Sequence, residues 1–140
     1  MSDVFAVDLA LDLSPVIPDA VLDDLRWHLG LLDGGRTMVD EMPGLEPLLA
    51  ARGPAVRIGG LLTGELVRAA DHWSLTARQE VHAELLPELE SLVERLAFNA
   101  TTEGVIGQVR LYEDDVPDVL VNRSGALVRI ALRPDESADF

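Results

Sequence analysis

Strict alternation of apolar and polar positions marks the first element of the chain. Residues 5–13 carry large apolar side chains at every odd position and only alanine or aspartate at the even positions between them. Successive side chains of a strand point to opposite faces, so this period of two predicts a strand with one apolar face and one small, acidic face. After Pro18 the apolar spacing changes to three and four residues, which predicts an amphipathic helix that ends at Gly30. The apolar stripe of this helix consists of Val21, Leu22, Leu25 and Leu29.

The middle of the chain predicts a β-hairpin that follows a long connection. Residues 31–54 contain Gly–Gly and Pro–Gly pairs and one short apolar cluster, so we expect a connection with a single helical turn. Residues 56–68 and 73–81 have the composition of strands, and the segment 70–72 between them predicts a turn. Glycines within the first of these strands predict a bulge or a close approach of another backbone. These glycines are Gly59, Gly60 and Gly64.

The clearest helix of the chain follows the predicted hairpin. Proline is tolerated only in the first turn of a helix, so Pro87 predicts a helix that begins near Ala83, and Asn99 marks its end. Three short strands are then predicted over residues 105–112, 119–122 and 126–132, because polar and glycine-containing turns separate them. The apolar stripe of the helix consists of Leu85, Leu86, Leu89, Leu92, Val93 and Leu96.

The predicted order is strand, helix, strand, strand, helix and strand, with an extra C-terminal hairpin. This is the order of the split βαβ, or ferredoxin-like, fold, an α+β architecture in which two helices cover one face of an antiparallel sheet. We expect one such domain over residues 1–132 and a frayed acidic tail over residues 133–140. Both long apolar stripes must be buried, so we expect the second helix to pack on the first strand. The predicted contacts join Leu89 and Leu92 or Val93 to Val7, Leu9 and Leu11.

The charge balance excludes several classes of partner. The 140 residues include 25 acidic and 11 basic side chains, a formal net charge of −14, and the acidic excess extends along the whole chain. Nucleic acids and anionic membrane surfaces attract cationic proteins, so we expect neither as a partner. A basic partner protein, in contrast, would be attracted by this charge.

Missing residue types narrow the chemistry further. All basic residues are arginine and there is no cysteine, which excludes lysine Schiff bases, the P-loop phosphate clamp, thiol nucleophiles and thiolate metal sites. We therefore expect no cofactor and no metal. The composition is typical of bacteria with high-GC genomes. Acidic residues interrupt the apolar opening and no apolar stretch is long enough to cross a membrane, so we expect a cytoplasmic protein.

His28 is the first candidate for acid–base chemistry. It follows Asp24 by four residues on the predicted helix, and a carboxylate on the same helical face could orient its imidazole as a base. Most pairs with this spacing are ordinary surface contacts. A catalytic role requires a pocket beside the pair.

Two acidic segments resemble metal sites in part. Glu80, His82 and Glu84 alternate, as metal ligands on one face of a strand would, but the helix that begins near Ala83 breaks their alignment. Residues 113–118 hold the densest acidic cluster, which lacks the spacing of a calcium-binding loop. A solvated turn between two strands is the better explanation for this cluster.

The uncovered face of the sheet carries the strongest candidate site. If the odd residues of the first strand face the helices, its aspartates share the opposite face with polar residues of the neighbouring strands. Two explanations fit: antiparallel sheets commonly leave one face in water, or a second subunit covers this face and encloses a polar cleft. The residues predicted to bind a ligand on this face are Asp8, Asp12, Thr76, Arg78, Gln108, Arg110 and Tyr112.

Three functions remain open at this point. The first is a non-catalytic homodimeric domain that uses its open sheet face for self-association or for binding a small ligand. The second is a cofactor-independent enzyme acting on a small organic substrate, with Arg78 or Arg110 holding an anion and His28 or Tyr112 moving a proton. It requires a pocket of at least roughly 300 Å³ lined by these groups together. The third is an acidic protein that binds a basic partner protein.

Overall fold

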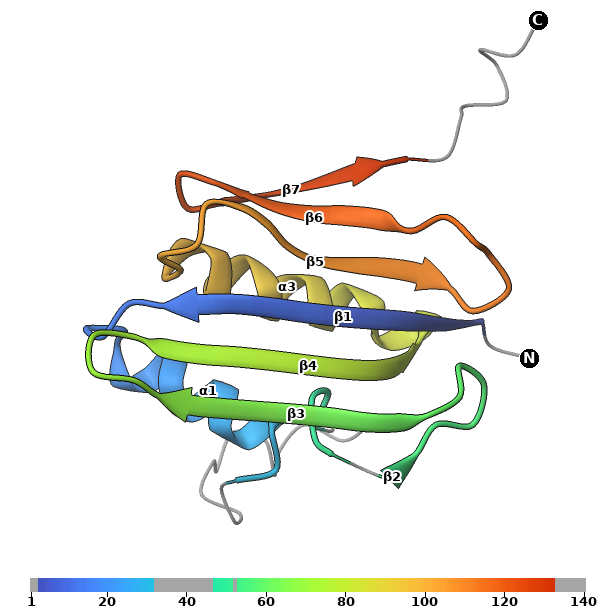
Figure 1. Ribbon diagram of the computed structural model, residues 1–140, viewed down its shortest axis with the longest axis horizontal. Helices are drawn as coiled ribbons and strands as arrows, with labels where there is room; N and C mark the ends of the chain where they lie inside the picture. The colour runs from blue at the N-terminus through green and yellow to red at the C-terminus, as the bar shows by residue number, and fades with distance from the viewer. Residues whose placement is uncertain (1–2, 32–46, 52, 133–140) are drawn as a thin grey trace, which may run out of the picture.

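The described chain forms an open antiparallel sheet with two helices on one face (Figure 1). The computed structural model describes residues 3–31, 47–51 and 53–132. The strands are β1 (Val4–Leu13), β2 (Gly53–Pro54), β3 (Leu61–Arg68), β4 (Trp73–His82), β5 (Gly104–Leu111), β6 (Asp118–Arg123) and β7 (Ala126–Ala131). The helices are α1 (Asp19–His28) and α3 (Leu86–Phe98), and the 3-10 turn η1 (Ala83–Leu85) precedes α3. The predicted α+β class is confirmed.

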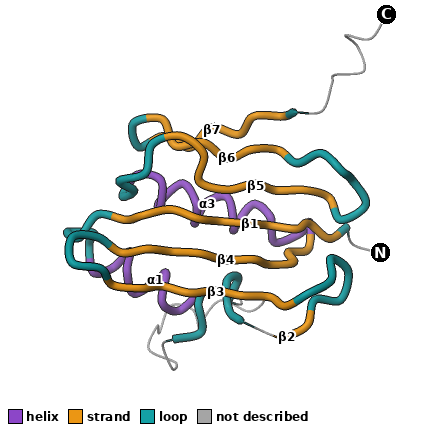
Figure 2. The backbone as a smooth tube through the Cα atoms, viewed as in Figure 1, coloured by secondary structure: helices purple, strands orange, loops and turns teal. Residues whose placement is uncertain are grey.

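The sheet is built around β1, its central strand. Its strand order is β2-β3-β4-β1-β5-β6-β7, and every neighbouring pair is antiparallel. Both helices lie behind the sheet in Figure 2, with α1 behind β3 and β4 and α3 behind β1 and β5. One face of the sheet therefore packs on the helices, and we call the opposite face the open face.

The core lies between the helices and the odd-numbered side chains of β1. Leu89, Leu92 and Val93 of α3 belong to the same buried cluster as Val7, Leu9, Leu11 and Leu13 of β1. The predicted packing of the long helix on the first strand is thus confirmed. Pro87 lies in the first turn of α3, where its missing N–H leaves no helical hydrogen bond unmade.

The strand predicted over residues 56–68 begins later than expected. Strand β3 starts at Leu61, because Gly59 and Gly60 adopt positive φ angles of 74° and 71° that interrupt an extended backbone. Part of the predicted helical turn in residues 31–54 lies outside the described residues, and Leu48 and Leu49 form a bend. The predicted tail over residues 133–140 also lies outside them.

Two glycines sit where another backbone passes too closely for a side chain. A Cβ atom on Gly64 would lie 1.8 Å from the carbonyl oxygen of Leu49, and one on Gly107 would lie 2.4 Å from that of Asp8. The predicted close approach in the hairpin is therefore found at Gly64. Segment 47–51 packs directly on β3 as a result.

Candidate functional site on the open sheet face

Strand register places the predicted polar residues on the open face. Paired residues of neighbouring strands share a face, and Asp8 pairs with Arg78 on one side and with Gln108 on the other. The same row continues from Arg78 to Thr63 of β3, and the next row of β1 and β4 pairs Ala10 with Thr76. These residues come from four strands, of which only β3 and β4 are joined by a short turn, so the folded sheet brings the four together.

A β-bulge in β5 adds an apolar wall to this polar row. The register between β5 and β6 shifts between Val105 and Gly107. The extra residue lets Val105 and Gln108 lie on the same face although they are three positions apart, while Ile106 between them is buried in the core. The sequence shows no sign of this bulge.

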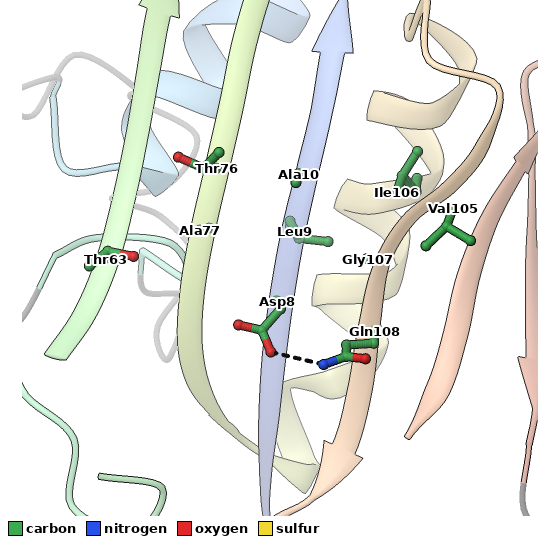
Figure 3. A pocket seen from close by; sticks show the side chains of 10 residues that line it. All are labelled: Asp8, Leu9, Ala10, Thr63, Thr76, Ala77, Val105, Ile106, Gly107 and Gln108. Atoms are coloured by element: carbon green, nitrogen blue, oxygen red, sulfur yellow. Dashed lines mark hydrogen bonds between the residues drawn. The ribbon is translucent and has the colours of Figure 1, made fainter. Parts of the chain in front are cut away.

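A groove of about 400 Å³ runs between these side chains. Figure 3 shows it from the open face, with Asp8 and Gln108 at one end, Ala10 and Thr76 further along β1 and β4, Thr63 on β3 and Val105 on β5. The Nε2 of Gln108 donates a hydrogen bond to Oδ2 of Asp8 over 3.3 Å. The residues that line the groove are Asp8, Leu9, Ala10, Thr63, Thr76, Ala77, Val105, Ile106, Gly107 and Gln108.

Comparison of the chain with protein-family models, curated proteins and solved structures found no match. Among the described residues, no helix has the length and apolar character needed to cross a membrane.

The two arginines predicted to hold an anion are engaged with loops of the chain itself. Arg78 donates to the carbonyl oxygens of Leu61 at 3.1 Å and Ile58 at 3.3 Å. Arg110 donates to the carbonyl oxygens of residues 111, 112 and 114, the last at 2.6 Å, and so holds the turn between β5 and β6. Neither arginine lines the groove.

Asp12 and Tyr112 also lie away from the groove. Oδ1 of Asp12 is 3.8 Å from Nε2 of His72, whose Nδ1 lies 2.7 Å from Oδ1 of Asp71. That hydrogen bond from His72 is the main cause that lowers the pKa of the Asp71 carboxyl. The phenol of Tyr112 bonds to the Glu113 carboxylate, which raises the pKa of Tyr112 above its ordinary value.

His28 lies on the other side of the sheet, in the helical layer. It is buried, its Nδ1 accepts a hydrogen bond from the Leu48 N–H at 3.3 Å, and its Nε2 is 3.8 Å from Oδ1 of Asp24. Arg95 of α3 donates to the other oxygen of Asp24 over 2.7 Å. The His28–Asp24 pair thus ties α1 to α3 and to segment 47–51, and the sheet separates it from Arg78, Arg110 and Tyr112.

The alternating Glu80, His82 and Glu84 do not converge. Glu80 and His82 belong to β4, whereas Glu84 lies in η1, and the described residues contain no group of three or more His, Cys, Asp or Glu side chains placed to hold a metal ion. Glu80 instead accepts hydrogen bonds from the backbone N–H groups of Val56, Arg57 and Ile58. It therefore anchors the loop that precedes β3.

This anchor leads to a measurable expectation for the loop. Glu80→Ala removes the acceptor of three N–H groups, and because these lie near water we expect a loss of about 1 to 2 kcal/mol in unfolding free energy. Amide hydrogen exchange at residues 56–58 should become fast. Glu84→Ala, the same change at an exposed side chain, should leave both quantities unchanged. Retained protection at residues 56–58 in Glu80→Ala would contradict this role.

A second feature of the open face is apolar and was missed by the sequence analysis. Val105 pairs with Val121, which pairs with Val128, and the neighbouring row joins Val119 to Ile130. We call these five residues the valine–isoleucine patch. Val105 is 64% exposed and the others are half-buried. Alternating apolar residues in β6 and β7 were a signal for this patch, but their face could be assigned only after the register was known.

Proposed function

We propose that this protein is a non-catalytic homodimeric domain whose two copies associate through the open sheet face. The valine–isoleucine patch is the main observation that supports this proposal. Five β-branched side chains, one exposed and four half-buried, form a continuous apolar surface over β5, β6 and β7, and an apolar surface patch on a small protein is typical of an association site. Valine and isoleucine lose little side-chain entropy on burial, which favours their use in an interface.

The size of the face supports a second copy as its occupant. Six long strands spaced about 4.8 Å apart, with about eight residues rising 3.3 Å each, give a face of roughly 750 Å². Stable complexes bury about 800 Å² on each partner. A twofold pairing of two such faces would place each apolar patch against the same face of the partner, as isologous interfaces require.

Light scattering coupled to size-exclusion chromatography tests the proposed dimer. The parent protein should elute with twice the 15.2 kDa mass of one chain at micromolar concentration. Val121→Glu should weaken association about 100-fold or more, because a twofold interface would bury two unpaired carboxylates. Val16→Glu makes the same change at a side chain that is 84% exposed in the turn before α1, and it should leave the dimer intact.

Two outcomes of this measurement would overturn the proposal. One is a parent protein that remains a monomer at every concentration tested. The other is a dimer that Val121→Glu and Val16→Glu leave equally stable, since association would then use another surface. Circular dichroism should show that both variants keep the fold of the parent protein.

We also propose a ferredoxin-like core within the larger sheet. The order β3-β4-β1-β5, with α1 between β1 and β3 and α3 between β4 and β5, supports this classification. The extra strands β6 and β7 extend this core and carry most of the apolar patch. An experimental structure tests the classification through the hand of the two helical crossovers, which must be right-handed.

A further inference from the structure

The groove on the open face offers hydrogen-bond acceptors and no cation. Its polar lining consists of the Asp8 carboxylate, the Gln108 amide and the hydroxyl groups of Thr63 and Thr76. None of its lining residues is arginine, lysine or histidine. An anionic ligand would find no opposite charge here, whereas a cationic ligand would.

The Asp8 carboxylate lacks a cationic partner within the described residues. Its cross-strand neighbour Arg78 turns toward the loop before β3 and bonds to carbonyl oxygens there. The contact made by Asp8 is the 3.3 Å hydrogen bond from the neutral Gln108 amide. Because Gln108 donates through Nε2, its Oε1 is available to accept from a ligand.

The other side of the groove is apolar. Val105 is 64% exposed and lines the groove directly, and the small side chain of Ala10 leaves room over the centre of β1. A hydrocarbon group placed there would remove apolar surface from water at roughly 25 cal/mol per Å². The groove thus combines a negative end with an apolar wall.

We propose that this groove binds a small organic ammonium ligand. The ammonium group pairs with Asp8 and donates to Oε1 of Gln108 and a threonine hydroxyl, while the hydrocarbon part lies along Ala10 and Val105. An ammonium carries three donors, which matches the acceptors present. The net charge of −14 attracts such cations and repels carboxylates of the same shape. All the residues that line the groove belong to one chain, but association of two copies through the open face would cover the groove, so the ligand and the partner copy compete for this face.

Titration with three ligands of equal length tests the proposal. Hexylammonium, hexanol and hexanoate differ only in the charge and polarity of one end. In heteronuclear NMR spectra, hexylammonium should cause saturable shifts confined to the amides of the groove-lining residues on β1, β3, β4 and β5. Hexanol should bind at least about tenfold more weakly, since it lacks the charge that pairs with Asp8. Hexanoate should cause no saturable shift.

Two variants and a matched control show whether Asp8 and the groove are responsible. Asp8→Asn keeps the shape of the side chain and should weaken hexylammonium binding about tenfold or more. Ala10→Leu fills the groove without changing its charge and should also abolish the shifts. Asp115→Asn makes the same charge change at an exposed turn residue and should bind as the parent does.

Three results would overturn the proposal. They are equal binding of hexanol and hexylammonium, an equal effect of Asp8→Asn and Asp115→Asn, and shifts spread over the acidic surface without saturation. The titration is repeated with Ile130→Glu, which places a carboxylate in the proposed interface on β7, apart from the groove-lining residues, and is designed to be monomeric. Binding of hexylammonium by this variant would show that the groove binds the ligand whether or not the proposed dimer forms.

Discussion

Leu89→Ala is expected to lower the unfolding free energy by about 2 to 5 kcal/mol, the range for leucine truncations in packed cores. Leu89 is 1% exposed and belongs to the cluster that joins α3 to β1. Removing its side chain leaves a cavity beneath the central strand, and neighbours on a rigid sheet can close such a cavity only in part. Urea denaturation followed by circular dichroism measures the loss.

Glu94→Ala is the matched control for this truncation. Glu94 lies on the exposed side of the same helix, so its replacement should change the unfolding free energy by no more than about 0.5 kcal/mol. A Glu94→Ala protein less stable than Leu89→Ala would mean that the two sides of α3 are interchanged. The open face and both proposals that rest on it would then be wrong.

Gly64→Ala is expected to cost about 3 kcal/mol, the upper part of the usual range for overpacking. A Cβ atom there would lie 1.8 Å from the carbonyl oxygen of Leu49 and 2.9 Å from Cδ2 of Leu29. The leucine side chain can rotate away, but the carbonyl oxygen moves only with its backbone. Segment 47–51 must therefore lift off β3.

This displacement has a second readout besides stability. Lifting segment 47–51 would break the hydrogen bond from the Leu48 N–H to Nδ1 of His28 and the one from Nε2 of Gln79 to the Ala50 carbonyl. Amide exchange at Leu48 should accelerate accordingly. Glu65→Ala, one position further along β3 on the open face, should change neither readout. A loss below about 1 kcal/mol in Gly64→Ala would show that this segment is not packed on β3.

Much of the fold follows from periodicity in the sequence. The alternation in residues 5–13 defines both faces of β1, and the stripe around Leu89 defines the buried side of α3. Pro87 limits the start of the helix. Each of these signals is local, since it depends only on the spacing of apolar residues and on backbone sterics.

The predicted start of the strand β3 was wrong, because a contact with a segment distant in sequence overrode the local pattern of apolar residues. Residues 56–58 are apolar enough to suggest a strand, but their N–H groups bond to Glu80 on β4. The positive φ angles at Gly59 and Gly60 then turn the chain into β3. Periodicity does not show such a contact, because its two halves are more than 20 residues apart in sequence.

The candidate site likewise has some features that the sequence predicts and others that it does not. The sequence alone placed Asp8, Thr76 and Gln108 on one face, because successive side chains of a strand point to opposite faces. The apolar face of the first strand indicated a side covered by helices, and its acidic face indicated an uncovered side. It also established the acidic charge and the absence of lysine and cysteine chemistry.

Only the tertiary structure decided which of these residues line the groove. Arg78 and Arg110 turn to carbonyl oxygens of nearby loops, and the bulge at Val105 and Gly107 brings an apolar wall beside Asp8. Register between strands also gathers the valine–isoleucine patch from β5, β6 and β7. The physical reason is that side-chain direction in a strand is a local property, whereas hydrogen-bond partners and strand register depend on packing between distant segments.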